Sequence, residues 1–241
     1  MEYLIHLLKD KKFSALLKDK EPYIIRTNRN IFVYLCASIM SQQLSVRVAD
    51  VIYERFLALY DGKEPAPQQV LDTDSLTLRN IGLSNNKVSY IKNVAAFAVD
   101  PGMGYNLLEK MDNEEIITYL TQIKGVGRWT VEMLLMSALG REDVFAVDDL
   151  GIQNAMISLY KLDRSDKKAL REKMLKISLK WSPYRTYACR HLWSWKDNDP
   201  VKKKSGKEIA AKKKSPRANK LAVKKATSVR AKTAQKKTKG V

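Results

Sequence analysis

The segment TQIKGVGRWTVEMLLMSALGREDVFAVDDLG, residues 121–151, carries the pattern that decides the fold of this chain. Four apolar residues recur at helical spacing up to the start of the turn: Ile116, Ile117, Leu120 and Ile123. Asp112, followed three residues later by Glu115, is typical of a helix start with a capping box. Gly125 and Gly127 then interrupt the helix, because glycine tolerates the positive φ that such a turn requires.

A second helix is predicted directly after this turn, where apolar residues again recur at helical spacing: Val131, Leu134, Leu135 and Ala138. The backbone N–H groups near Gly125 and Gly127, and those that open the second helix, have no helical partner. They also lie at the positive end of the helix dipole, so together they make an anion-binding site. An ordinary helical hairpin without a ligand has the same turn, and the turn alone leaves both interpretations open.

Four blocks of sequence occur in a fixed order along the chain. They are IMSQQLSVRVADVIYERF (residues 39–56), LRNIGLSNNKVSYIKNVA (78–95), the glycine turn with VDDLG (124–151) and WSPYRTYACRHLWSW (181–195). Together they resemble the helix-hairpin-helix DNA glycosylase superfamily, and within it the DNA-3-methyladenine glycosylase II branch. The resemblance covers roughly residues 30–195. It implies a monofunctional glycosylase that removes alkylated purines, of the 3-methyladenine and 7-methylguanine type, from double-stranded DNA in base-excision repair.

The apolar spacing is helical nearly throughout and convincing period-two runs are missing, so we expect an all-α fold of about ten helices. The resemblance implies two helical lobes around a cleft. One lobe is expected to hold the middle of the chain through the hairpin. The other is expected to combine the N-terminal helices with the segment after about residue 157. We expect this core to span residues 1–197, followed by a disordered Lys-rich tail over residues 198–241.

The charge of the chain is concentrated near its end. Residues 201–241 contain 16 Lys and Arg residues and a single acid, Glu208, so they carry +15 of the formal net charge of +18. Such a segment cannot bury enough apolar surface to offset the entropy lost on ordering. It is either a solubility tail or an arm that binds polyanions, and a DNA-binding core favours the arm.

The sequence predicts neither a cofactor nor membrane association. Two cysteines, Cys36 and Cys189, allow no disulfide framework or zinc spacing, and the iron–sulfur cluster of endonuclease III-like relatives needs four cysteines. The sequence shows no signal peptide and no apolar run long enough to cross a bilayer. We therefore expect a soluble intracellular monomer, in the cytoplasm with the nucleoid of a bacterium or in the nucleus of a eukaryote.

Asp148 and Asp149 precede a predicted helix, and their local pattern alone favours a helix cap. The resemblance places the catalytic aspartate at Asp149 and makes Asp148 a supporting acid. One carboxylate suffices because N3- and N7-alkylated purines are cationic and leave as neutral bases. The carboxylate then stabilises the positive charge that builds on the deoxyribose. This chemistry needs no catalytic metal and no imidazole, and His191 is interpreted as structural.

The expected base pocket consists of Trp129, Trp193 and Met133. The resemblance assigns the two tryptophans to ring faces that receive a flipped, electron-poor base. Tryptophans at helical spacing more often pack in a core, which is the alternative. The pocket is expected to be less aromatic than that of well-known relatives, which have tyrosines at the positions of Met133 and Ser194. Relatives that also cut the DNA backbone carry a lysine at the position of Trp129. Lys124 lies before the glycines and therefore does not match that position. Without a lysine there, a monofunctional enzyme is expected.

Two segments are expected to contact DNA. The hairpin is expected to bind a phosphate through backbone N–H groups, at Gly125, Val126, Gly127 and Arg128. The residues expected to fill the gap left by the flipped base are Gln42, Gln43 and Leu44, with Gln43 at the family's wedge position. A glutamine pair near a helix end is also typical of ordinary surface. The resemblance further suggests a monovalent cation bound by the carbonyl oxygens of Thr121, Ile123 and Val126.

Two other functions fit parts of the sequence. A non-catalytic helix-hairpin-helix DNA-binding protein would keep the hairpin and the tail, but it has no need of Asp149 beside the phosphates. A glycosylase of other damaged bases is also possible, and its glycosylase/lyase form for oxidised bases is disfavoured by Trp129 and by the missing cluster cysteines. The sequence does not rank 3-methyladenine against other alkylated purines.

Overall fold

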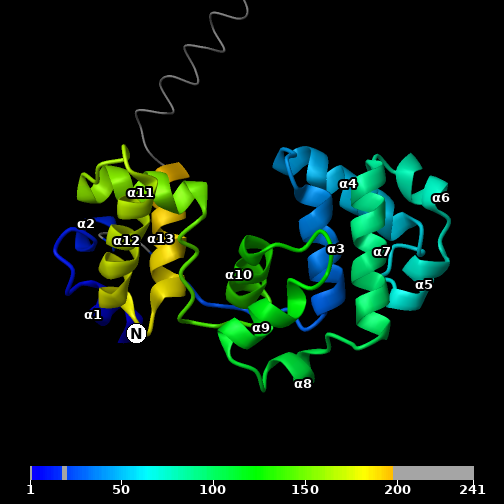
Figure 1. Cartoon of the computed structure of the whole chain (residues 1–241), viewed down its shortest axis with the longest axis horizontal. Coiled ribbons are helices and arrows are strands. Elements are labelled where there is room, and N and C mark those ends of the chain that lie inside the picture. The colour runs from blue at the N-terminus through cyan, green and yellow to red at the C-terminus, as the bar shows by residue number, and fades with distance from the viewer. Residues whose placement is uncertain (1, 18–20, 198–241) are drawn as a thin grey trace, which may run out of the picture. The chain divides into compact units, whose positions relative to one another are not determined.

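The computed structural model of the chain describes residues 2–17 and 21–197. These residues form helices joined by turns, with no β-strand among them, which confirms the all-α prediction (Figure 1). In chain order the elements are α1 (Glu2–Leu7), α2 (Ser14–Leu17), α3 (Ile31–Ser41), α4 (Val46–Ala58), α5 (Pro67–Asp72), α6 (Ser75–Asn80), α7 (Asn85–Val99), α8 (Tyr105–Leu108), α9 (Asn113–Leu120), α10 (Arg128–Ser137), α11 (Leu150–Tyr160), α12 (Lys167–Ser178), the 3₁₀ helix η1 (Leu179–Trp181) and α13 (Arg185–Asp197).

Contacts between Cα atoms divide the chain into two units, Met1–Ser194 and Trp195–Val241. The first unit contains every element up to the last turn of α13. The predicted tail, residues 198–241, lies outside the described residues, and its disorder stays a prediction. Within the described residues, no helix combines the length and the apolar character needed to span a membrane.

The predicted helical hairpin is present as α9 and α10. The capping box is confirmed, because Asp112 Oδ1 accepts the Glu115 N–H at 2.8 Å and Glu115 Oε2 accepts the Asp112 N–H at 2.6 Å. Gly125 has a φ of +105°, and a Cβ added to it would lie 2.3 Å from Cγ of Tyr90 on α7. Glycine is required here because the backbone is left-handed and also packs directly on a tyrosine ring.

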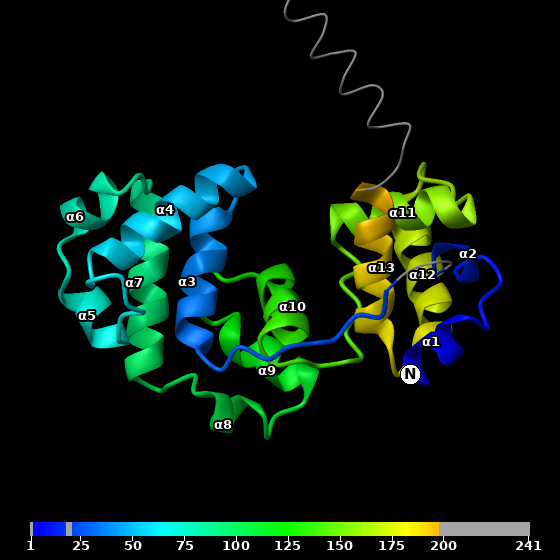
Figure 2. The ribbon, with the colours of Figure 1, turned by 180° about the vertical axis from the view of Figure 1, so that it is seen from behind.

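Helices α3 to α10 form one group, in which α7 packs against α3 and α5, and α10 packs against α3 and α9 (Figures 1 and 2). Its core includes fully buried side chains from three helices: Leu35, Cys36 and Ile39 of α3, Ile91, Val94 and Ala95 of α7, and Leu134 and Leu135 of α10. Each fully buried aliphatic side chain of Val, Leu or Ile size contributes about 1.5–3 kcal/mol. This group is therefore a hydrophobic core in its own right.

Helix α4 packs against α3 through a narrower stripe than its apolar spacing suggests. Ile52 and Phe56 are buried, as helical spacing predicts. Val48 and Val51 recur in the same pattern, yet they are 45% and 39% exposed. Helix α3 is the main packing partner of α4, and the row of Val48 and Val51 stays partly exposed.

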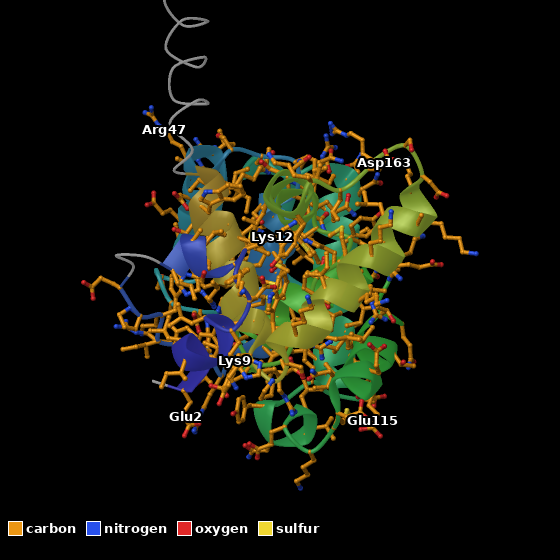
Figure 3. The ribbon with its side chains drawn as sticks, turned by 90° about the vertical axis from the view of Figure 1, so that its left-hand side faces the viewer. Glu2, Lys9, Lys12, Arg47, Glu115 and Asp163 are labelled. Atoms are coloured by element: carbon orange, nitrogen blue, oxygen red, sulfur yellow. The ribbon has the colours of Figure 1, made fainter. Side chains whose placement is uncertain are left out.

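The second group combines α1 and α2 with α11, α12, η1 and α13, as the sequence predicted for the other lobe (Figures 1 and 2). Trp181 is fully buried at its centre, and its ring centroid lies 4.9 Å from that of Phe13 and 5.8 Å from that of Phe145. Lys12 lies over the ring of Tyr160, in the part of the surface that faces the viewer in Figure 3. The C-terminal part of this group begins at Leu150 and not near residue 157 as expected, because α11 is one continuous helix.

We expect Gly125→Ala to lower the free energy of unfolding by about 1–3 kcal/mol, because alanine meets both an unfavourable positive φ and the Tyr90 ring. Gly127→Ala is the matched control, since its φ is −99° and a Cβ there has no heavy atom within 4 Å. Urea unfolding of the two variants measures the difference. Equal loss in both variants would contradict the packing argument.

Candidate active site

Asp149 is the N-cap of α11 and lies where the two groups of helices meet. Its Oδ1 accepts the N–H of Ile152 at 2.8 Å and the indole N–H of Trp193 at 2.9 Å. Its Oδ2 accepts the indole N–H of Trp129 at 2.9 Å. Trp129 belongs to α10 and Trp193 to α13, so each group of helices supplies one tryptophan. Asp149 therefore caps its helix, and its carboxylate is also held by two indoles, which capping does not require.

Gly151 leaves the space that this arrangement needs. A Cβ at this position would lie 2.9 Å from Oδ1 of Asp149 and 3.1 Å from Cδ1 of Trp193. The Asp149 carboxylate cannot move aside without losing one of its three hydrogen bonds. A larger residue at position 151 would therefore displace either the carboxylate or the indole of Trp193.

The loop that leads from α10 to Asp149 is anchored to both groups of helices. On one side, Arg141 Nη2 donates to three carbonyl oxygens within residues 108–111, at distances of 2.8–3.3 Å. On the other side, the Asp143 carboxylate accepts two hydrogen bonds from the Arg185 guanidinium, at 2.6 and 2.9 Å. Burial opposes the charge of Asp143, but its hydrogen bonds, above all those from Arg185, outweigh burial and lower the pKa of Asp143. Asp149 is thus presented by a loop fixed at both ends.

Asp148, the predicted supporting acid, points elsewhere. Its Oδ1 accepts a hydrogen bond from Nε of Arg171 on α12 at 3.3 Å, and both side chains are about half exposed. Exposed ion pairs of this kind contribute about 0–1 kcal/mol. Among the described residues, no hydrogen bond joins Asp148 to Trp129 or Trp193. The two adjacent acids therefore have different surroundings.

The three predicted pocket residues lie on two helices. Trp129 is 45% exposed despite its hydrogen bond, and Trp193 is half-buried. Met133 is half-buried and lies one turn after Trp129 on α10. The Tyr34 hydroxyl on α3 donates to the carbonyl oxygen of Met133 at 3.0 Å, and burial raises the pKa of Tyr34. The structure therefore brings both tryptophans to Asp149 and leaves Trp129 about half exposed to solvent.

The hairpin presents several unused backbone donors. Within the described residues, the N–H groups of Gly125, Gly127 and Arg128 have no acceptor, whereas that of Val126 donates to the carbonyl oxygen of Ile123 at 2.9 Å. Gly127 is the N-cap of α10, and its φ of −99° suits any residue. The turn does not require glycine at this position, so its effect is to leave the N-terminus of α10 bare.

The guanidinium of Arg128 binds two carboxylates of the protein. Nη1 and Nη2 donate to Glu114 on α9, and Nε donates to Oε1 of Glu132 at 3.1 Å. Glu132 is 3% exposed, and its Oε2 has no hydrogen-bond partner among the described residues. Burial raises the pKa of Glu132, although Arg128 opposes this effect. The Arg128 side chain is therefore engaged, and its backbone N–H is the part available at the hairpin.

The predicted wedge residues form the loop that follows α3. Gln42 is the C-cap of α3, and Gln43 has a φ of +58°, which is unusual for a residue other than glycine. The side chains of Gln43 and Leu44 are exposed. The left-handed backbone at Gln43 carries a strain cost, and its role as the wedge residue stays a prediction.

Residues 36–179 match the model of the HhH-GPD superfamily of base excision DNA repair proteins. The chain belongs to this family. It is 35% identical over 192 residues to DNA-3-methyladenine glycosylase 1 of Schizosaccharomyces pombe, covering 79% of each chain. The resemblance of the four sequence blocks to the helix-hairpin-helix DNA glycosylase superfamily is thereby confirmed.

Solved structures of HhH-GPD relatives agree with this assignment. The chain matches a Schizosaccharomyces pombe 3-methyladenine DNA glycosylase in complex with abasic DNA with a TM-score of 0.73 and 32% identity, over 83% of this chain and 98% of that chain. It matches a DNA-3-methyladenine glycosidase from Bacillus halodurans with a TM-score of 0.72 and 32% identity, over 82% and 90% of the two chains.

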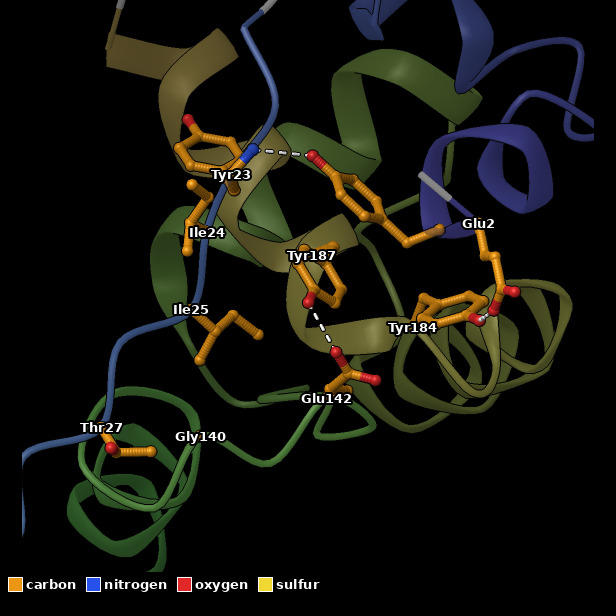
Figure 4. Close-up of a pocket in the computed structure, with 10 residues that line it drawn as sticks. Glu2, Tyr23, Ile24, Ile25, Thr27, Gly140, Glu142, Tyr184 and Tyr187 are labelled. Atoms are coloured by element: carbon orange, nitrogen blue, oxygen red, sulfur yellow. Dashed lines mark hydrogen bonds between the residues drawn. The ribbon is translucent and has the colours of Figure 1, made fainter.

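A separate cavity of about 480 Å³ in this HhH-GPD chain shares no lining residue with the Asp149 site (Figure 4). Tyrosines and two acids line it, and the hydroxyls of Tyr184 and Tyr187 donate to Glu2 and Glu142 at 3.1 and 2.6 Å. His191 is buried nearby, with its ring centroid 4.7 Å from that of Tyr23. This position agrees with the interpretation of His191 as structural.

Sequence reasoning missed two residues of the site in this HhH-GPD chain. Gly151 has a visible signal, since it follows the two acids and Leu150 in VDDLG, but a glycine near a helix start is usually assigned to the turn. Glu132 also has a signal, because it is a single acid within the apolar run of α10. Its bond to Arg128 is an i,i+4 pair within α10 that spacing allows, whereas its burial is not visible in the sequence.

We expect Asp149→Asn to slow base excision by about 10²–10³-fold while the fold is retained. Asparagine still caps α11 through its oxygen, but its NH₂ group faces the indole N–H of Trp129, so the charge and one hydrogen bond are lost. Asp148→Asn is the matched control and should change the rate less than threefold or so, because Asp148 meets only Arg171. Single-turnover excision measures both rates, and an exchange of the two phenotypes would assign the chemistry to Asp148.

Proposed function

We propose that this chain is a monofunctional DNA glycosylase of the 3-methyladenine glycosylase II type. It hydrolyses the N-glycosidic bond of alkylated purines, such as 3-methyladenine and 7-methylguanine, in double-stranded DNA during base-excision repair. The observation that carries the proposal is the Asp149 carboxylate, held by two indoles and a backbone N–H beside a half-exposed tryptophan ring. Because its substrate is chromosomal DNA, the protein is expected with the nucleoid of a bacterium or in a nucleus.

The chemistry requires one fixed negative charge. An alkylated purine is cationic and leaves as a neutral base, so it needs no general acid. Positive charge builds on the deoxyribose instead, and a carboxylate held in place stabilises it without reorganisation. Oδ1 of Asp149 already accepts two hydrogen bonds, whereas Oδ2 accepts one. Oδ2 is therefore the oxygen with capacity left for the sugar cation or for the attacking water.

The exposed indole of Trp129 suits the binding of a flipped base. Its N–H is bound to Asp149, which fixes the ring, and 45% of the residue faces solvent. A cationic base stacks favourably on such an electron-rich face. Met133, one turn further along α10, supplies an apolar and adaptable wall in place of a second ring.

The hairpin supports the binding of a DNA phosphate. The free N–H groups of Gly125, Gly127 and Arg128 lie at the start of α10, where the helix dipole favours an anion. Absence of a side chain at Gly127 allows a phosphate to approach the backbone closely. The carbonyl oxygens of Thr121 and Val126 accept no hydrogen bond from the described residues, which suits the monovalent cation suggested with the carbonyl of Ile123.

The wild-type protein should release 3-methyladenine and 7-methylguanine from methylated duplex DNA and nothing from unmethylated DNA. Chromatography of the freed bases measures the release, and Asp149→Asn serves as the inactive control. Binding to the duplex without release of any alkylated base would reduce the protein to a non-catalytic DNA-binding member of its family.

No covalent adduct should form when the protein is incubated with abasic-site DNA and borohydride. Trp129 occupies the position expected for a Schiff-base lysine, and its ring is bound to Asp149. Mass spectrometry detects any adduct and identifies its residue, and Lys124→Ala tests the nearest lysine. An adduct on an identified lysine would refute monofunctional chemistry.

A further inference from the structure

Lys87 connects two helices at the base of the wedge loop. It lies in the first turn of α7, and its Nζ donates to the carbonyl oxygens of Met40 at 2.9 Å and Gln42 at 2.8 Å. Both acceptors belong to the C-terminal end of α3, from which the loop Gln42–Leu44 departs. One ammonium group therefore satisfies two carbonyl groups that the end of a helix leaves without partners.

The position of Lys87 is unfavourable for its own helix. A cation in the first turn lies at the positive end of the α7 dipole, where an acid would be stabilised. Partial burial adds to this cost and lowers the pKa of Lys87. The C-terminal end of α3 offsets both effects, because its carbonyl groups carry the negative end of the α3 dipole. The interaction between the helices, rather than the stability of α7, thus explains a lysine at this position.

The bond to Gln42 has a direct effect on Gln43. The carbonyl group of Gln42 and the N–H of Gln43 belong to one peptide plane, so fixing the carbonyl fixes the plane from which Gln43 departs. Gln43 has a φ of +58° and an exposed side chain. This conformation is unfavourable for a glutamine, so a bond that orients the preceding peptide plane helps to maintain it. Within the described residues, the ammonium of Lys87 is the side-chain group that donates a hydrogen bond to the peptide group between Gln42 and Gln43.

We propose that Lys87 is a positioning residue that holds the Gln42–Leu44 loop in the conformation in which Gln43 fills the gap left by a flipped base. The proposal rests on the proposed function, which supplies the flipped base. Lys87 itself touches neither the base nor Asp149. It acts by orienting the Gln43 backbone before DNA binds, so that the ordering of the loop does not reduce the binding free energy.

The chain contains a closely matched control on the same helix. Lys92 of α7 donates through Nζ to the carbonyl oxygens of Leu71 at 3.1 Å and Thr73 at 2.7 Å. These acceptors lie at the C-terminal end of α5, which carries no predicted DNA contact. Lys92→Met therefore removes an equivalent lysine cap without affecting the wedge loop.

The test compares Lys87→Met with Lys92→Met in the full chain, using a duplex that carries a tetrahydrofuran abasic analogue beside 2-aminopurine. Fluorescence of 2-aminopurine reports insertion into the gap, and titration gives the affinity for this duplex relative to an undamaged one. Lys87→Met should lower this affinity ratio about tenfold and remove most of the fluorescence change. The reason is that Gln43 no longer fills the gap, so the cost of unstacking the neighbouring base is not offset. Amide hydrogen exchange at residues 42–45 should also accelerate in the free protein. Lys92→Met should leave all three readouts at the wild-type level.

Lys87→Gln, which keeps a neutral amide group as donor, is the second variant if Lys87→Met does not fold. Its affinity ratio and fluorescence change should lie below those of the wild type, and its amide exchange at residues 42–45 should be faster. If the Lys87 and Lys92 variants have equal affinity ratios and equal exchange in the loop, the proposal is wrong.

Failure of the proposed function is a separate outcome. A wild-type protein that gives the fluorescence change but releases no base from methylated DNA has a positioned wedge and no glycosylase activity.

Discussion

The hydrogen bonds from two indoles to the Asp149 carboxylate are the constraint that the rest of the structure has to satisfy. Trp129 reaches Asp149 only if α10 starts where the Gly125 turn ends, and that turn is fixed by its contact with Tyr90 on α7. Trp193 reaches the same carboxylate because α13 approaches the site closely enough at Gly151. Contacts far from the carboxylate therefore decide its orientation, and an error at any of them would alter the site.

Charged side chains lie among apolar ones in the interior between the two groups of helices. Arg128 binds Glu114 and the buried Glu132, and Arg185 binds Asp143 across the same region. These side chains line a cavity of about 260 Å³. The partly exposed pairs with Glu114 and Asp143 contribute about 0–1 kcal/mol each, whereas loss of Arg128 would leave the buried Glu132 without its partner. The Arg128 bonds tie α10 to α9, and the Arg185 bonds tie α13 to the loop that leads to Asp149.

The sequence predicted those parts of the molecule that depend on local patterns. The capping box of α9, the glycine turn and the buried faces of α7 and α10 follow from spacing and residue type, and they are confirmed. Asp149 was assigned through the resemblance, and its three hydrogen bonds agree with a special role beyond capping. The bonds from Trp129 and Trp193 are not predictable from the sequence. Spacing places each indole on its helix, but it does not show where the indole N–H points. The exposure of Val48 and Val51 is also not predictable, since apolar spacing does not reveal how many neighbours a helix has.

The N-terminal helices complete the second group of helices with residues from the far end of the chain. Tyr3 stacks on Tyr187 with ring centroids 4.0 Å apart, and Nε2 of His6 donates a hydrogen bond to the carbonyl oxygen of Lys180 at 3.0 Å. Helices α3 to α10, by contrast, form a continuous stretch of sequence. During synthesis this middle part can fold as soon as it leaves the ribosome, whereas α1 and α2 must wait for α13. The Asp149 site, which needs a tryptophan from each group, therefore forms last, and a nascent or truncated chain holds folded DNA-binding helices without an assembled carboxylate.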